Sequence, residues 1–122
     1  VYLQDNNTWR EFNWGIRANG GTGGTGTGGD GGAVYFYANC ELDIFSFIEL
    51  HGGDSTSNTG GEGGYMQLET DDLRGVVMTV GNGGDGTSGG GAVDTYIEVN
   101  NVYSCAIVSE GTGGAGSAGS GG

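Results

Sequence analysis

The chain has 122 residues, of which 31 are glycine, and it contains no proline and two cysteines. Its 15 acidic residues outnumber three arginines, and the formal net charge of −12 argues against nucleic acid and anionic membranes as partners, because both attract basic protein surfaces. No apolar run is long enough for a membrane-spanning helix, so membrane insertion is not expected.

Glycine is gathered into tracts that alternate with apolar segments. The tracts cover 20–32, 52–64, 83–91 and 113–122. Their opening glycines, Gly20, Gly52, Gly83 and Gly113, are 32, 31 and 30 residues apart, a period that is typical of repeat proteins. The sequence therefore predicts a single domain, 1–122, of four approximate repeats: 1–32, 33–64, 65–91 and 92–122.

Apolar and polar residues alternate between the tracts. In the second repeat, the alternation runs over 33–38 and resumes at Leu42 after a polar turn at 39–41, and the third and fourth repeats follow the same plan. The first segment, 1–19, is the least regular. A period of two residues predicts strands, so each repeat is interpreted as strand, turn, strand and glycine tract.

The predicted fold is all-β. Stacking the repeats in register would bury one face of every strand and bring the glycine tracts together backbone to backbone. The expected architecture is a short, glycine-rich parallel β-solenoid of about four repeats. The alternative is an antiparallel β-sandwich of hairpins with glycine-rich loops, which tight connections such as Asn100-Asn101 permit.

The glycine tracts carry a resemblance to known proteins. The stretches 20–32 and 111–122 resemble the polyglycine-II tracts of phage tail adhesins and of glycine-rich antifreeze proteins. The period of strand plus glycine tract resembles glycine-rich extracellular β-solenoid and filament proteins. Composition and resemblance together favour an extracellular or cell-surface location.

Catalysis is not expected. His51 is the single histidine, and no serine or cysteine lies near a second base in the sequence. No cofactor is expected, and calcium is the one ligand left open. Carboxylates at Asp30, Asp54, Glu62 and Asp85 fall at related places in the repeats, and Ca²⁺ prefers carboxylate and carbonyl oxygens. The alternative is that these charges solubilise polar loops.

The cysteines and one sequon suggest covalent features. Cys40 and Cys105 are candidates for a disulfide, within one chain or between chains. In an in-order solenoid they would be two rungs apart, about 9.6 Å, whereas a disulfide needs Cα atoms within about 7 Å. A solenoid would thus leave both thiols free or pair them between subunits. Asn6 begins an Asn-Asn-Thr glycosylation sequon, a pattern that also arises by chance.

Two functions are compatible with these features. The first is a structural subunit of an extracellular filament or matrix, a homopolymer that assembles through β edges and glycine tracts. The bulky Trp9, Phe12 and Trp14 would then offer an apolar assembly surface. The second is a glycan- or ice-binding adhesin module of a phage tail or cell surface. Exposed aromatics on one face, such as Tyr35, Tyr37, Phe45 and Phe47, would then stack on sugar rings.

Overall fold

The structure, a computed structural model, describes residues 2–5 and 11–122. Strands are its only regular elements over those residues: β1 (Tyr2–Asp5), β2 (Glu11–Arg17), β3 (Ala33–Glu49), β4 (Tyr65–Val80), β5 (Gly86–Ser88), β6 (Asp94–Glu110) and β7 (Gly116–Ser120). Each of the strand pairings described is parallel. The chain is therefore a parallel β-solenoid of about three turns, and the antiparallel sandwich is wrong.

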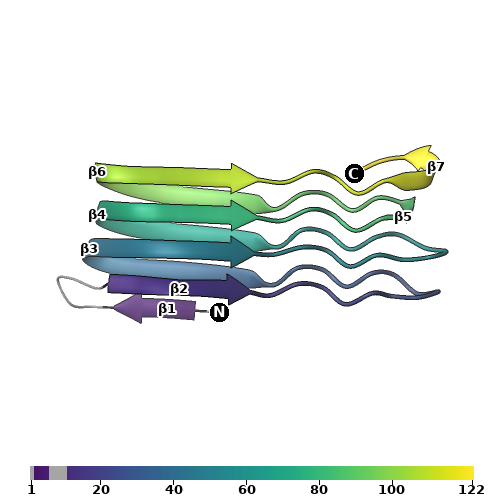
Figure 1. The fold of residues 1–122 in the computed structure, drawn as a ribbon, viewed down its shortest axis with the longest axis horizontal. Helices are drawn as coiled ribbons and strands as arrows, with labels where there is room; N and C mark the ends of the chain where they lie inside the picture. The colour runs from purple at the N-terminus through teal and green to yellow at the C-terminus, as the bar shows by residue number, and fades with distance from the viewer. Residues whose placement is uncertain (1, 6–10) are drawn as a thin grey trace.

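The strands stack as rungs. In the main sheet the order is β1-β3-β4-β6, and β2 also pairs with β3. The strands β1 and β2 thus share the first rung, and β3, β4 and β6 form the next three (Figure 1). Register is kept from rung to rung, so that Phe36 pairs with Leu68 and Leu68 with Ile97. Side chains about one repeat apart in the sequence therefore form columns along the stack.

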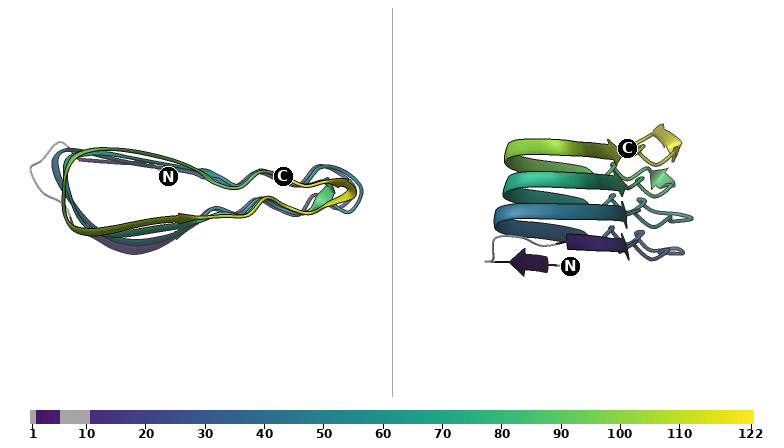
Figure 2. Two further views of the ribbon diagram at one scale, coloured as in Figure 1. Left: turned by 90° about the horizontal axis from the view of Figure 1, so that it is seen from above. Right: turned by 60° about the vertical axis from the view of Figure 1, so that its left-hand side comes forward.

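Each long strand bends once and so has two arms. In β3 the first arm is 33–38 and the second is 41–49, and Asn39 and Cys40 lie exposed at the bend. Two separate strands and a turn were predicted, but the strand continues around the corner with only a register shift between Ala38 and Glu41. Viewed along the stack, the arms enclose a wide head and converge on a narrow tail (Figure 2).

The core fills the space between the two arms. Alternate residues of β3 and β4 are buried, as the two-residue period predicts. The buried apolar residues are Val34, Phe36, Ala38, Leu42, Ile44, Ile48, Leu50, Met66, Leu68, Leu73 and Val77. Full burial of a large side chain of this kind contributes about 1.5–3 kcal/mol, so the head supplies the hydrophobic stabilisation of the molecule.

The glycine tracts form the narrow tail, and they pair backbone to backbone as expected. Within a rung, the amide of Gly29 donates to the carbonyl of Gly21 across the tail at 2.8 Å. Between rungs, Gly53 donates to Gly29 and Gly84 donates to Gly61, each at 2.8 Å. The tail is thus a bundle of extended backbone passes, each bonded across the rung and to the rungs beside it.

Close backbone approach explains why these positions are glycine. A Cβ added to Gly84 would collide with the carbonyl oxygen of Gly53 on the rung below, and one added to Gly60 would collide with that of Gly84. Side chains fit at every third position, as at Asn19 and Thr22, which are exposed. Two of three residues must therefore be glycine, which is the packing expected of a helix with three residues per turn.

This packing gives the first prediction. Replacing Gly84 with alanine should lower the free energy of unfolding by about 1–3 kcal/mol, because the new methyl group meets fixed backbone. Gly21 holds the same column on the first rung, where a Cβ would meet nothing within 4 Å. In dilute solution Gly21→Ala should stay within about 1 kcal/mol of the wild type. Denaturant titration monitored by circular dichroism measures both, and equal midpoints for Gly84→Ala and the wild type would contradict this account.

Candidate functional site

The outward side chains of the first arm form a tyrosine-rich surface. This tyrosine face consists of Tyr35, Tyr37, Tyr65, Gln67, Glu69, Tyr96 and Glu98, drawn from β3, β4 and β6. Phe45 and Phe47, expected on the same face, belong to the second arm instead. The ring of Tyr35 lies 5.7 Å from that of Tyr65 and 6.4 Å from that of Tyr37. The hydroxyl of Tyr96 donates to a carboxylate oxygen of Glu98 at 2.7 Å. This hydrogen bond raises the pKa of Tyr96 above its usual value.

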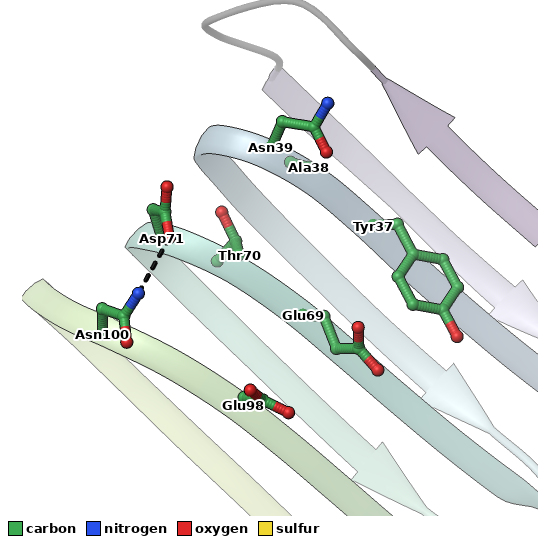
Figure 3. A pocket seen from close by; sticks show the side chains of 8 residues that line it. All are labelled: Tyr37, Ala38, Asn39, Glu69, Thr70, Asp71, Glu98 and Asn100. Atoms are coloured by element: carbon green, nitrogen blue, oxygen red, sulfur yellow. Dashed lines mark hydrogen bonds between the residues drawn. The ribbon is translucent and has the colours of Figure 1, made fainter.

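A shallow hollow lies at the end of the first arm, beside the bend (Figure 3). It has a volume of about 230 Å³ and is lined by Tyr37, Ala38, Asn39, Glu69, Thr70, Asp71, Glu98 and Asn100. The side-chain amide of Asn100 donates to a carboxylate oxygen of Asp71 at 2.8 Å. Glu69 and Glu98 occupy neighbouring rungs of one column. An aromatic ring beside carboxylates and amides can stack on and hydrogen-bond a hydroxyl-rich ligand.

The structure divides the four proposed calcium ligands between two columns. Asp30 stands above neither Asp54 nor Asp85, but in register with Glu62 on the return pass of the tail. Over the part of the chain that the structure describes, no group of three or more histidine, cysteine, aspartate and glutamate side chains could hold a metal ion. The four carboxylates therefore do not meet at one site, and calcium binding stays a prediction.

The same carboxylates bond to the backbone of the following rung. An oxygen of Asp30 accepts from the amide of Glu62 at 2.9 Å, and Glu62 accepts from Gly91 at 2.5 Å. In the second column Asp54 accepts from Asp85 at 2.9 Å, and Asp85 accepts from Ala115 at 2.7 Å. Each of these side chains thus accepts a hydrogen bond from a backbone amide of the next rung.

A third column repeats this arrangement with amide and imidazole side chains as acceptors. The amide of His51 donates to Asn19 at 2.9 Å, the amide of Asn82 to Nδ1 of His51 at 3.0 Å, and the amide of Thr112 to Asn82 at 3.0 Å. His51 is a structural acceptor here. Sequence reasoning missed this role, although an acceptor residue before each Gly-Gly pair was the available signal.

The acceptor columns give a second prediction. Asp85→Ala removes the acceptor for the amide of Ala115 and should cost about 0.5–1.5 kcal/mol, with amide exchange at Ala115 up to about tenfold faster. Asp85→Asn keeps an acceptor oxygen at the same place and should restore protection. Hydrogen exchange measured with and without Ca²⁺ separates this role from metal binding. Protection that depends on Ca²⁺ and is lost in Asp85→Asn would show a calcium ligand instead.

The glycosylation and assembly candidates belong to the first segment of the sequence, 1–19. Asn6 and Trp9 fall outside the described residues, so glycosylation and the role of Trp9 stay predictions. Phe12 and Trp14 belong to β2, in register with Ile44 and Ser46 of β3. Their side chains are not among those that the structure describes, and their proposed part in assembly likewise stays a prediction.

Cys40 is free and exposed at the bend of β3. The backbone of Cys105 pairs with Gly75, which pairs in turn with Ile44. Cys105 therefore lies two rungs from β3 and in the column of Ile44, which is four residues along the strand from Cys40. Two rung spacings are about 9.6 Å, beyond the roughly 7 Å that a disulfide spans.

This placement gives a third prediction. A thiol reagent should label Cys40 in the folded protein, and non-reducing peptide mass spectrometry of the monomer should find no Cys40–Cys105 link. A pairing of these residues between chains remains compatible with the fold. Detection of that link in a species with the mass of one chain would contradict the register.

The last rung leaves the end of the core open. Leu42 and Leu73 are 1% and 0% exposed, whereas Val102, the next residue in the same column, is 56% exposed. Similarly, Val77 is 0% exposed and its neighbour Ile107 is 38% exposed. Among the described strands, β6 has one neighbour, β4. The solenoid thus ends in a 17-residue strand with one free edge.

The two ends of the tail carry complementary backbone groups. Within the stack, the amides of Gly20 and Gly23 donate upward to the carbonyls of His51 and Asp54, each at 2.8 Å. Gly113 holds the donor position of Gly20 on the last rung, where no described rung lies above it. On the first rung, Asn19 holds the acceptor position of His51, with no described rung below it. In this column, one end of the stack therefore presents an amide and the other end presents the carbonyl that would accept from it.

Comparison with protein-family models, curated proteins and solved structures finds no match to this chain. The described residues include no helix long and apolar enough to cross a membrane.

Proposed function

We propose that the protein is a structural subunit that stacks end to end into a filament. The observation that carries this proposal is the open β6 end, where core positions that are otherwise sealed are exposed to solvent. An unpaired strand edge of this length is a template for a further strand. The first rung of a second copy has the register to fill it, because each rung repeats the columns of the rung before. An extracellular filament or matrix would suit this composition.

Backbone hydrogen bonds support head-to-tail stacking of two copies. In a continued stack, the amide of Gly113 would donate to the carbonyl of Asn19 in the next copy, as Gly20 donates to His51 within the chain. Inverting the second copy would bring two equal ends together, so the amide of Gly113 would not meet the carbonyl of Asn19. A head-to-tail contact that does not close on itself produces fibres.

Side-chain columns support the same arrangement. The second copy would cover Val102 and Ile107, two exposed apolar residues of β6 that stand in core columns. Along the edge of the second arm, Arg17 pairs with Glu49 within the chain. A continued stack would place Arg17 of the next copy above Glu110, which ends that column. An acid and a base would again be neighbours.

A second candidate function is glycan binding by the tyrosine face. The observation that favours it is the hollow in which Tyr37 lies beside Glu69, Glu98 and Asn100. A glycan array with wild-type protein tests this candidate, and Tyr37→Ala should abolish any signal that this face produces. Glycan binding and stacking use different surfaces, so both can hold together.

Two substitutions at opposite ends of the molecule test stacking. Gly21→Ala should fold normally, since its methyl group enters open space in one chain. In a stack that methyl group would collide with the backbone of Gly114 in the preceding copy, as a Cβ on Gly53 would collide with Gly21. Val102→Lys should block the other end by leaving a charge at a core position. We expect both variants to lose the filaments that the wild type forms, measured by negative-stain microscopy and sedimentation velocity.

Thr22→Ala is the matched control, because Thr22 is adjacent to Gly21 but exposed on the outside of the tail. It should assemble like the wild type, with circular dichroism confirming the fold of every variant. A wild type that stays monomeric at high concentration, or a Gly21→Ala variant that still forms filaments, would refute end-to-end stacking.

A further inference from the structure

The outer surface of the second arm is apolar. This apolar face consists of Phe45, Phe47, Val76, Met78, Val80, Ala106 and Val108, which project outward from β3, β4 and β6. Phe45, Phe47 and Val76 are 49%, 44% and 38% exposed. They form adjoining columns, so the exposed apolar surface is continuous across three rungs. Contiguous patches of this kind on a soluble chain mark interaction sites.

The borders of the apolar face hold balanced charges. Arg17 pairs with Glu49 at one border, and this contact holds the pKa of Glu49 below its usual value. At the other border Arg74 lies 2.6 Å from Glu41 and 5.0 Å from the ring centre of Tyr103. Two of the three arginines of the chain therefore border this one face. The tyrosine face, in contrast, carries Glu69 and Glu98.

This charge distribution selects the partner. A copy that approached by the tyrosine face would bring carboxylates together, and a net charge of −12 makes such contacts repulsive. The apolar face is the outer surface on which a second acidic copy meets arginines. We propose that two copies pack their apolar faces together, related by a two-fold axis parallel to the strands.

The two-fold axis reverses the order of the rungs and keeps the columns. Phe47 then faces Met78 of the second copy, and Phe45 faces its Val76, so that a large ring always meets a smaller aliphatic side chain. At the borders, Asp43 faces Arg74 and Arg17 faces Glu110 of the other copy. Every arginine of the face thus meets an acid across the interface. Sheets packed in this way lie about 10 Å apart.

The other face-to-face arrangement is disfavoured by charge. A two-fold axis along the stack keeps the order of the rungs and reverses the columns. Glu49 would then face Asp43 of the second copy twice in each dimer, and Phe45 would face Phe47. Like charges placed opposite each other in an interface are destabilising, so the axis parallel to the strands is preferred.

The size of the face predicts a weak dimer. Four rungs and about eight residues per strand span roughly 500 Å² on each copy, which is near the lower limit for a specific interface. Pairing between single copies should therefore be reversible. Copies joined in a stack would present several such faces together, and their pairing would be strengthened by multivalency. The lateral contact does not depend on end-to-end stacking, because it uses a different surface.

The experiment uses Gly21→Ala as the parent, since this variant should fold but not stack. Sedimentation velocity over a concentration series should show a reversible monomer–dimer equilibrium. Adding Phe47→Lys should weaken dimerisation at least about tenfold, because a charge would be buried at the centre of the interface. Tyr96→Lys is the matched control: Tyr96 is 46% exposed on the opposite face and its substitution should leave dimerisation unchanged.

A charge exchange tests the orientation of the two copies. In the same parent, Arg17→Glu should weaken the dimer, and adding Glu110→Arg should restore it. Within one chain these residues lie three rungs apart, about 14 Å, so restoration can only come from contact between copies. A parent that stays monomeric, or a Phe47→Lys variant that dimerises equally well, would overturn the proposal.

If Gly21→Ala still forms filaments, end-to-end stacking as proposed fails while lateral pairing can still be measured. Phe47→Lys should then halve the mass per length of those filaments in scanning transmission microscopy. An unchanged mass per length would overturn lateral pairing.

Discussion

Backbone contact in the glycine tail is the constraint on which the rest of the structure depends. Each pass of the tail bonds across its rung and to neighbouring rungs at about 2.8 Å, and positions such as Gly60 and Gly84 have no room for a Cβ. These bonds set the distance between rungs. The head must keep the same spacing, so Phe36, Leu68 and Ile97 are stacked in one column and cannot pack in a staggered arrangement.

The head and the tail are stabilised by different interactions. Glycine loses more conformational freedom on folding than any other residue, and the tail buries little apolar surface to offset that loss. Its stability comes from satisfying nearly every amide, including those that the backbone alone would leave unpaired. Asn19, Asp54 and their equivalents accept these remaining hydrogens. The head supplies the hydrophobic burial, and its regular rungs hold the tail passes in register.

The sequence predicted the solenoid because its two periods are independent of tertiary detail. Spacing of about 31 residues between glycine tracts indicates repeats, and the alternation over 33–38 indicates strands. The bend was misread as a turn, because Asn39 and Cys40 interrupt the alternation without breaking the strand. A three-residue period was also readable in Asn19-Gly-Gly-Thr22, where each end of the motif points outward. Without that period, the aspartates were considered as candidate calcium ligands or solubilising charges, and their bonds to the next rung were not predicted.

The surfaces of the second arm were harder to predict. Leu42, Ile44 and Ile48 alternate with Phe45 and Phe47, so both faces of the strand read as apolar and the pattern alone does not say which set is buried. Only the enclosure of one set between the arms decides it. The same holds for Arg17 and Glu110, whose relation depends on stacking residues that are far apart in the sequence.

Stacking and lateral pairing together determine the symmetry of the proposed assembly. A single stack is polar, because its two ends differ: one end presents β6 and the amide of Gly113, and the other presents the first rung and the carbonyl of Asn19. Pairing with reversed rung order sets two such stacks side by side in opposite directions. The two ends of the double filament are then equivalent, and each offers one open β6 edge and one open first rung. The apolar faces are sealed inside, and the acidic tyrosine faces lie outside, where their like charges keep double filaments from associating further.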